Sequence, residues 1–258
     1  MIENCGEKNS QSRVLIAVPT YNERDNVNEL CNRLVKAMPG AEIVFIDDGS
    51  PDGTAQEVQR FCILFTNISL IVRESKDGIG SAHKVALEEA HRRHSDVLVT
   101  LDADLTHNPE DIPRLLQCLD SADVVVSSRF KSGGGLEDWP TWRKVLTNLG
   151  HFATQLFLLV PYDSTSALRA YRVGDFTNLI LKMGLSDSYS FFYQSLACLV
   201  RVKARVGEVP VVLTARAFGS SKMKKRDIFF GVVGLVWFAI THRSRVRRTY
   251  HKSEGNQK

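Results

Sequence analysis

Short apolar segments that alternate with helix-like segments are the feature that most constrains the fold of this 258-residue chain. The apolar segments are rich in β-branched residues and are bounded by turn-forming or charged residues, as buried strands are. Five strands are predicted in this way, at residues 13–19, 42–46, 68–73, 96–101 and 123–127. Strand–helix alternation with nearly continuous apolar strands predicts an α/β fold, in which a mostly parallel sheet is covered by helices on both faces.

Carboxylates follow two of these predicted strands. Asp47 and Asp48 come after the second strand, and Asp102 and Asp104 come after the fourth. In open sheets of this kind, ligands bind beyond the carboxyl ends of the strands. A charge at the end of a buried strand is costly unless a partner compensates it. Both pairs are therefore predicted to lie at the ligand-binding edge.

The spacing of Asp102 and Asp104 predicts a metal site. In an extended chain, residues i and i+2 project to the same side, so the two carboxylates converge near the hydroxyl of Thr106. Such a set suits a hard divalent cation, Mg²⁺ or Mn²⁺, that keeps waters and shares phosphate oxygens. The chain has no GxGxxG or GxxxxGK[ST] loop, which disfavours a dinucleotide-binding or P-loop enzyme.

Other polar residues near this edge are interpreted as structural. Ser50 or Asp52 is predicted to cap the helix that follows the second strand, and Asn108 is predicted to cap another helix, with Pro109 in its first turn. The chain has no HExxH motif and no spaced histidine cluster. The individual histidines are therefore interpreted as structural or exposed, and the three considered are His83, His107 and His151.

Composition narrows the class of protein. Five scattered cysteines without a CxxC pair favour reduced thiols over a disulfide framework or a zinc site. The net charge of +4 is too small to imply nucleic acid. Cations gather instead on both sides of an apolar stretch at residues 228–240. A helix of that length rises about 20 Å, short of the roughly 30 Å of a bilayer core, so the stretch is predicted to lie on a membrane surface, with a buried core helix as the alternative.

The N-terminal residues are polar and show no signal peptide. The expected location is the cytoplasmic side of a membrane, with peripheral attachment.

Four segments together resemble a known family. VPTYNERDNV, FIDDGSPDGT, GIGSAHKVAL and LDADLTHNP, in this order, are similar to segments of the family 2 glycosyltransferases, which have the GT-A fold. Within that family the chain most resembles the dolichol-phosphate and polyprenol-phosphate mannosyltransferases, over residues 13–222. The resemblance implies an inverting transferase that moves a hexose, mannose from GDP-mannose above all, onto dolichyl or polyprenyl phosphate.

The resemblance also implies roles for individual residues. The positions that hold the nucleoside of the donor are matched by Pro19, Tyr21, Glu23, Ile46 and Asp48. Asp102, Ala103 and Asp104 match the DxD segment, with Asp104 as the direct metal ligand. Thr106, which stands where family members often have Gln or Ser, is the expected third ligand.

Basic residues are matched in the second half of the chain. Arg129, Arg216 and Lys222 match residues that close over the donor and acceptor phosphates, and Arg143 and Thr147 lie where the family contacts the lipid phosphate. Asp104, Arg129 and Lys222 are the expected catalytic residues. Two of these also follow from local arguments. Arg129 ends an apolar strand, where an unpaired guanidinium would be costly and an anionic partner is suited. Lys222 follows Gly-Ser-Ser, a stretch able to fold over a diphosphate.

A polyprenyl phosphate acceptor is consistent with the absence of an evident catalytic base. An alcohol acceptor needs a general base to remove its proton. A phosphate monoester is largely dianionic near neutral pH, since its second pKa is about 6, and its oxygen can attack directly.

Departures from the family pattern leave alternatives open. Phe192 and Gln194 replace a Gln and a Glu, and Ser166 replaces a Gly in the acceptor segment that contains Asp163, Thr165, Arg169, Tyr171 and Arg172. These changes allow another nucleotide sugar, such as a UDP-sugar, or an inactive membrane-associated subunit. A saccharide acceptor is disfavoured because no family-type ED or QxxRW motif occurs in the C-terminal half. A nucleic-acid module is disfavoured because few aromatic residues lie among the cations.

Four segments are expected along the chain. They are a disordered tail at residues 1–12, a GT-A catalytic domain at 13–218, an acceptor loop with a membrane-interface helix at 219–248, and a second tail at 249–258.

Overall fold

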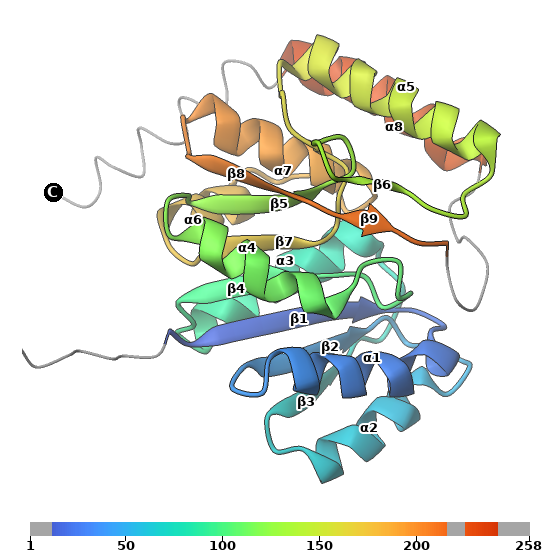
Figure 1. The fold of residues 1–258 in the computed structure, drawn as a ribbon, viewed down its shortest axis with the longest axis vertical. Coiled ribbons are helices and arrows are strands. Elements are labelled where there is room, and N and C mark those ends of the chain that lie inside the picture. Colours follow the sequence, from blue (N-terminus) through green and yellow to red (C-terminus); the bar gives the residue numbers. More distant parts are fainter. Residues whose placement is uncertain (1–11, 216–224, 242–258) are drawn as a thin grey trace, which may run out of the picture.

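The computed structural model describes residues 12–215 and 225–241. Its main sheet has seven strands (Figure 1). In spatial order they are β3 (Ile68–Val72), β2 (Glu42–Asp47), β1 (Val14–Thr20), β4 (Val97–Thr100), β7 (Arg169–Arg172), β5 (Val124–Ser128) and β8 (Val206–Pro210). The predicted strands are present, within one or two residues of the expected bounds.

Helices cover both faces of this sheet. One face carries α1 (Arg24–Ala37), α2 (Thr54–Leu64) and α4 (Ile112–Leu119), and the other carries α3 (Ile79–Arg92), α6 (Asp175–Lys182) and α7 (Ser190–Arg201). The alternation of β1 shows the two layers directly, because Leu15 and Ala17 join the core on the α3 side while Ile16 and Val18 join the core on the α1 side. The predicted α/β sheet with helices on both faces is confirmed.

The sheet is mixed rather than wholly parallel. Strand β7 lies between β4 and β5 and runs antiparallel to both, while the other pairs are parallel. The sequence did not identify β7 as a strand, because Arg169 and Arg172 at its two ends break the apolar pattern of its neighbours. Arg169 is nevertheless fully buried.

Two more helices and a small sheet complete the described residues. Helices α5 (Thr141–Leu158) and α8 (Lys225–Thr241) lie side by side at the end of the molecule beyond β8 (Figure 1). Short strands β6 (Gly135–Leu136) and β9 (Val212–Leu213) pair in parallel near the carboxyl ends of the main strands. Gly134 precedes β6 in a turn that only glycine fits, since a Cβ atom there would lie 2.4 Å from the carbonyl oxygen of Ser128.

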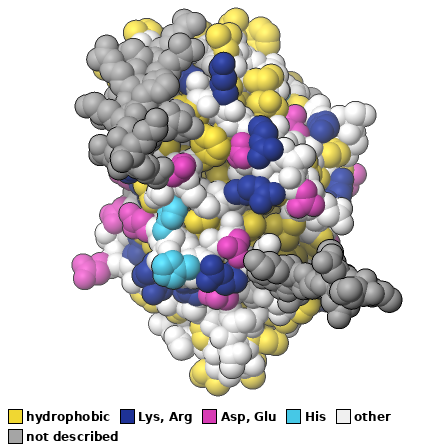
Figure 2. Space-filling view, turned by 90° about the vertical axis from the view of Figure 1, so that its left-hand side faces the viewer, with side chains coloured by type: hydrophobic (Ala, Val, Ile, Leu, Met, Phe, Trp, Pro, Cys, Tyr) yellow, Lys and Arg dark blue, Asp and Glu magenta, His cyan; other side chains and the backbone are white. Residues whose placement is uncertain are grey.

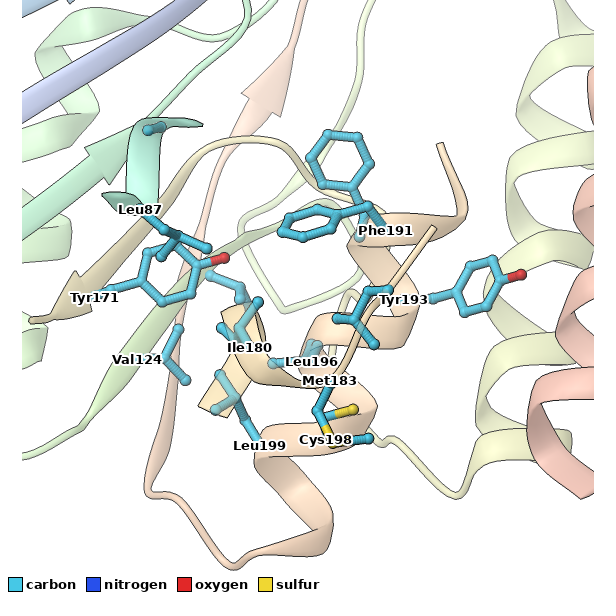
Figure 3. Packing of buried hydrophobic residues seen from close by; sticks show 14 of the residues in the cluster. Leu87, Val124, Tyr171, Ile180, Met183, Phe191, Tyr193, Leu196, Cys198 and Leu199 are labelled. Atoms are coloured by element: carbon cyan, nitrogen blue, oxygen red, sulfur yellow. The ribbon is translucent and has the colours of Figure 1, made fainter. Parts of the chain in front are cut away.

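Helix α7 forms the link between the sheet and this outer helical pair. Figure 3 shows Leu196 and Leu199 of α7 packed toward Val124 of β5 and Ile180 of α6, while the Tyr193 ring points the other way. Tyr193 packs edge-on against Phe238 of α8, with ring centroids 6.3 Å apart, and its hydroxyl donates to the Gly231 carbonyl at 3.4 Å. Buried contacts of this kind therefore hold the inner side of α8.

Candidate active site

Strand register brings the first two motifs together at the carboxyl edge of the sheet. Pro19 of β1 is the register partner of Ile46 of β2, and Thr20 is the partner of Asp47. The Asp48 amide donates to the Thr20 carbonyl at 3.0 Å, which continues the pairing beyond the strands. The segments PTYNE and FIDDGS are therefore neighbours in space as well as matched motifs.

Asp47 stabilises the loops at this edge through hydrogen bonds. Its carboxylate accepts from the Thr20 hydroxyl at 3.0 Å, from the Ser50 amide at 2.8 Å and from the Ser50 hydroxyl at 2.6 Å. The Ser50 hydroxyl in turn accepts from the Asn22 amide at 2.9 Å. Ser50 thus connects the two loops and does not cap α2. Asp52 stabilises the first turn of α2, since its carboxylate accepts a hydrogen bond from the Thr54 amide at 3.0 Å.

Asp48 faces a partner that sequence analysis did not find. The guanidinium Nε of Arg73, which follows β3, lies 3.3 Å from the Asp48 carboxylate. Both side chains are nearly buried, at 11% and 6% exposed. The Arg73 Nη1 is buried without a hydrogen-bond partner in the structure as described. A basic residue directly after a strand of the same sheet was the signal available for this pairing.

Burial raises the pKa of Asp48 to about 6, and Arg73 opposes the shift while Asp47 adds to it. The folded protein therefore binds this proton more tightly than the unfolded chain does. The protonated carboxyl of Asp48 stabilises the folded state fully below about pH 4. This stabilisation, worth up to about 3 kcal/mol of unfolding free energy for a shift of this size, is lost as the pH rises to about 6. We expect urea unfolding between pH 4 and 7 to show this decline in the wild type. The Asp48→Asn variant should lack it, and identical pH slopes for the two proteins would contradict this account.

Tyr21 and Glu23 lie on the loop after β1. The Lys76 ammonium lies 3.8 Å from the centroid of the Tyr21 ring, a cation–π distance. The Glu23 carboxylate accepts a hydrogen bond from the Asn26 side chain at 2.7 Å. The backbone amide of Glu23 donates to the Thr54 hydroxyl at 2.9 Å. These contacts order the loop at which the resemblance places the donor nucleoside.

The DxD segment lies on the opposite side of β1, after β4. Asp104 is buried and Asp102 is half-buried. One oxygen of Asp104 accepts from both the hydroxyl and the amide of Thr106, at 2.7 and 3.1 Å. Thr106 therefore orients Asp104, a role that the sequence spacing did not show.

The donor set fits a hard cation that shares its ligands with a phosphate. Within the described ranges, no group of three or more His, Cys, Asp or Glu side chains is placed to hold a metal by itself. Asp102 and Asp104 supply two carboxylates and Thr106 a hydroxyl, all oxygen donors. Mg²⁺ binds through one or two carboxylates together with waters and substrate phosphates, so these residues fit such an ion.

Asn108 and His107 follow the DxD segment. Asn108 precedes a short 3₁₀ turn, η1 (Pro109–Asp111), but its side chain makes no capping bond and instead accepts from Arg33 at 3.1 Å. Asn108 therefore occupies the predicted N-cap position, with Pro109 in the first turn, but its side chain makes no capping hydrogen bond. His107 is buried, and burial lowers its pKa to about 4, with Arg129 lowering it further and Asp104 opposing the shift.

Arg129 has a partner within the protein. Its guanidinium donates to both oxygens of Asp163, at 2.8 and 2.6 Å, and also to the Thr165 hydroxyl. Asp163 is fully buried, and although burial opposes it, Arg129 holds the pKa of this carboxyl below its usual range. The Asp163 amide donates to Glu208 at 2.9 Å. The sequence analysis expected Arg129 to be unpaired within the protein and therefore to need an anionic ligand. This expectation is wrong, because Asp163 supplies the opposite charge.

Arg169 of the acceptor segment is a structural residue. Its guanidinium donates to the carbonyls of Ser164, Ser166 and Phe192 at 2.8, 2.8 and 3.0 Å, and to the Ser195 hydroxyl at 3.1 Å. All of these groups are buried in the same core. The guanidinium joins β7 to α7 and does not face solvent.

Two departures from the family pattern, Phe192 and Ser166, also lie in this core, while Gln194 of α7 is half-buried. Phe192 is 5% exposed and packs edge-on against His83, with ring centroids 4.8 Å apart. Gln194 accepts from the Ser186 amide at 2.8 Å. Ser166 shares a short hydrogen bond with Ser127 at the end of β5. Each departure is therefore matched by a packing or hydrogen-bond partner.

The remaining predicted residues are divided between two parts of the chain. Arg143 and Thr147 lie half-buried on α5, where the Arg143 guanidinium is 4.9 Å from the Trp139 ring and 6.0 Å from the Trp142 ring. Arg216 and Lys222 lie outside the described residues.

Comparison with known proteins identifies the family of this chain. The pattern of glycosyl transferase family 2 matches residues 15–178. An undecaprenyl-phosphate mannosyltransferase from Micrococcus luteus is 34% identical over 90% of this chain and 96% of its own length. A polyprenol monophosphomannose synthase from Mycolicibacterium smegmatis is 35% identical over 84% of this chain and 83% of its own length. A dolichol-phosphate mannosyltransferase from Pyrococcus furiosus is 34% identical over 84% of this chain and 61% of its own length.

The fold is also similar to that of solved structures. Glucosyl-3-phosphoglycerate synthase from Mycobacterium tuberculosis, crystallised with Mn²⁺, UDP and glucosyl-3-phosphoglycerate, superposes with a TM-score of 0.63 at 17% identity. The superposition covers 90% of this chain and 80% of that one. With the family pattern over more than half of its residues, with relatives above 30% identity and with this architecture, the chain belongs to glycosyl transferase family 2 and has the GT-A fold.

Proposed function

We propose that this enzyme transfers a hexose, mannose from GDP-mannose first of all, onto the phosphate of a dolichyl or polyprenyl phosphate with inversion at the anomeric carbon. The proposal rests on two acidic segments that lie on either side of β1. Asp48 follows β2, and Asp102 and Asp104 follow β4. This edge can receive a nucleoside on one side and a diphosphate on the other. The names of the relatives, which act on polyprenyl phosphates, support the acceptor.

Asp102 and Asp104, with Thr106, are the residues proposed to hold Mg²⁺ or Mn²⁺. When bound, such an ion would neutralise charge that develops on the departing nucleoside diphosphate. On the chain's own side, Thr106 holds Asp104 in one orientation through its two hydrogen bonds.

Charge at the acceptor side favours a phosphate over a hydroxyl group. Asp163 is the buried carboxylate beside Arg129, and its two-point pairing with that guanidinium makes it a poor proton acceptor. A saccharide hydroxyl would need a base to take its proton, whereas a phosphate monoester brings its own negative charge. Arg129, Arg143, Arg216 and Lys222 remain the proposed cations for the donor and acceptor phosphates.

The acceptor also sets the proposed location. A polyprenyl phosphate resides in a bilayer, so the enzyme is proposed to work while attached peripherally to a membrane. Within residues 12–215 and 225–241, no helix combines the length and the hydropathy needed to cross one.

A transfer assay tests the proposal. The protein is incubated with labelled GDP-mannose, GDP-glucose, UDP-glucose or UDP-galactose, with Mg²⁺ or Mn²⁺, and with polyprenyl phosphate, and label is then measured in the lipid phase. We expect label from GDP-mannose, and none when unphosphorylated polyprenol replaces the phosphate. Label transferred only from a UDP-sugar would show that the donor is a UDP-sugar and not GDP-mannose. Label found in a soluble saccharide would show that the acceptor is a saccharide hydroxyl and not a lipid phosphate. No transfer from any donor would favour an inactive subunit.

A further inference from the structure

A buried polar atom without a partner lies on His151 of α5. Its Nδ1 atom is buried and forms no hydrogen bond with any of the described residues. Buried polar atoms are nearly always paired in proteins, so an unpaired one calls for a ligand or a water molecule. The ring itself is held in place, because it stacks on Phe130 with centroids 3.8 Å apart and 8° between the planes. Nδ1 is therefore an ordered atom that a ligand can use.

The surroundings of His151 are those of the proposed acceptor site. Phe130 directly follows Arg129, and the Arg129 guanidinium lies 5.3 Å from the centroid of the same Phe130 ring. Burial lowers the pKa of His151, and among the nearby charges Asp163 opposes this shift, Arg129 adds to it and Glu208 opposes it. The ion pair between Arg129 and Asp163 is thus close enough to act on the imidazole.

The two nearby carboxylates are engaged by other donors. Both oxygens of Asp163 accept from the Arg129 guanidinium, at 2.8 and 2.6 Å, and one oxygen of Glu208 accepts from the Asp163 amide at 2.9 Å. A neutral imidazole can carry its proton on Nδ1 and donate it there. An anionic oxygen supplied by a ligand would give this donor its missing acceptor.

The same ion pair also lies near the metal segment. Burial lowers the pKa of His107, which directly follows Thr106, and Arg129 adds to that shift while Asp163 opposes it. The charges of Arg129 and Asp163 therefore reach both the DxD side of the site and α5. An acceptor phosphate held beside this pair would be near the donor diphosphate, as direct transfer of a sugar between them requires.

Helix α5 places two more polar side chains in line with His151. Arg143, Thr147 and His151 are spaced four residues apart and are all half-buried, so they form one stripe along the helix. Successive members of the stripe are about 6 Å apart along the axis. Thr147 and His151 can therefore contact the same phosphate group.

We propose that His151 is a further contact of the acceptor phosphate, to which its Nδ1–H donates a hydrogen bond beside Thr147 and Arg129. The inference rests on the proposed function and deepens it, because it adds a residue to the acceptor site. His151 binds and orients the phosphate and does not act as a base, since a dianionic phosphate has no proton to lose.

Two substitutions separate this hydrogen bond from the packing of the ring. His151→Phe keeps a flat ring that can stack on Phe130 but removes both nitrogens, whereas His151→Asn removes the ring and leaves an amide N–H near the position of Nδ1. We expect His151→Phe to raise the KM for polyprenyl phosphate by about tenfold or more, because a hydrogen bond to a charged group is lost. Its KM for the donor should not change. His151→Asn should recover most of the lost affinity for the acceptor.

The opposite order of the two variants would overturn the inference. If His151 served only to pack against Phe130, asparagine would be the more harmful replacement and phenylalanine the milder one. The matched control is His94→Asn, at an exposed histidine that precedes β4, near the amino ends of the parallel strands. Figure 2 shows that face of the molecule, on which histidine side chains lie among charged ones. The control should keep both KM values, and urea midpoints verify that all three variants fold.

A spectroscopic measurement on the wild-type protein observes the contact directly. Nitrogen NMR of protein labelled with ¹⁵N-histidine follows Nδ1 during titration with geranyl phosphate, a short water-soluble prenyl phosphate. We expect the Nδ1 resonance of His151, assigned by its absence from either variant, to shift with geranyl phosphate and to stay in place with geraniol. A shift with GDP but not with geranyl phosphate would assign His151 to the donor diphosphate and overturn the inference.

The contact and the reaction can fail separately. Wild-type transfer to geranyl phosphate, with an unchanged acceptor KM in His151→Phe, would overturn the role of His151 and leave the proposed function in place. A His151 resonance that shifts with geranyl phosphate in a protein that transfers no sugar would keep the phosphate contact and remove the proposed function. Absence of both the transfer and the shift would remove both.

Discussion

The Asp104→Ala variant is expected to lose sugar transfer by about a thousandfold or more. Asp104 is buried in the loop after β4, and Thr106 orients one of its oxygens through two hydrogen bonds. Removing one preorganised electrostatic contact to a developing charge typically lowers kcat by about 10²–10³-fold, and loss of the metal position removes more. The measurement is labelled sugar in the lipid phase at saturating donor and cation.

A second measurement separates a chemical role of Asp104 from a structural one. Calorimetric titration of the variant with GDP should show that Mn²⁺ no longer strengthens nucleotide binding. Asp120→Ala, at an exposed aspartate that follows α4, is the matched control and should keep both transfer and cation-dependent binding. An Asp104→Ala protein with wild-type dependence on Mn²⁺ would exclude Asp104 as a ligand.

The second large effect concerns stability. We expect the Arg169→Met variant to lose about 3–5 kcal/mol of unfolding free energy, because each buried acceptor left without its donor costs about 1–3 kcal/mol. Methionine has a similar length but no donors, so the carbonyls of Ser164, Ser166 and Phe192 lose the hydrogen bonds that they receive in the core. The measurement is urea unfolding followed by circular dichroism.

The matched control lies on the same strand. Arg172 ends β7 at an exposed position and donates to the carbonyls of Ala122 and Leu119. Its replacement by methionine should cost less, about 0.5–1.5 kcal/mol per hydrogen bond, because water can reach this site and replace the lost donor. If Arg169 were an acceptor-binding residue, Arg169→Met would instead raise the KM for polyprenyl phosphate and leave the unfolding free energy unchanged.

Much of the fold was predictable because its signals are local. The predicted strands near β1, β2 and β4 differ from the observed ones by one or two residues, since an apolar β-branched run and the turn after it are properties of neighbouring residues. Strand β7 was missed because Arg169 at its start is compensated by residues far away in the sequence. Helix α5 was also missed as a complete helix, since its outward face is apolar where a surface helix is ordinarily polar.

Part of the candidate site was predictable for the same reason. Asp48, Asp102 and Asp104 follow strands, and the carboxyl ends of parallel strands share one edge. Their partners were not predictable. Arg73 approaches Asp48 only because β3 lies beside β2, and Asp163 reaches Arg129 only because the chain returns to pair β7 with β5. Arg216 and Lys222 stay predictions from the resemblance, outside the described residues.

The sequence by itself determined the α/β class, the family motifs and the acidic edge, because periodicity, turn residues and motif spacing act over a few neighbouring positions. Only the tertiary structure decided which charges are compensated and which apolar side chains stay outside. Arg129 and Arg169 look alike in sequence, as cations near strand ends, yet one pairs with a carboxylate and the other is buried among carbonyls. Leu158 and Leu159 are adjacent, yet one is 4% and the other 67% exposed. Burial depends on contacts between distant segments, and those contacts exist only after the sheet and helices have packed.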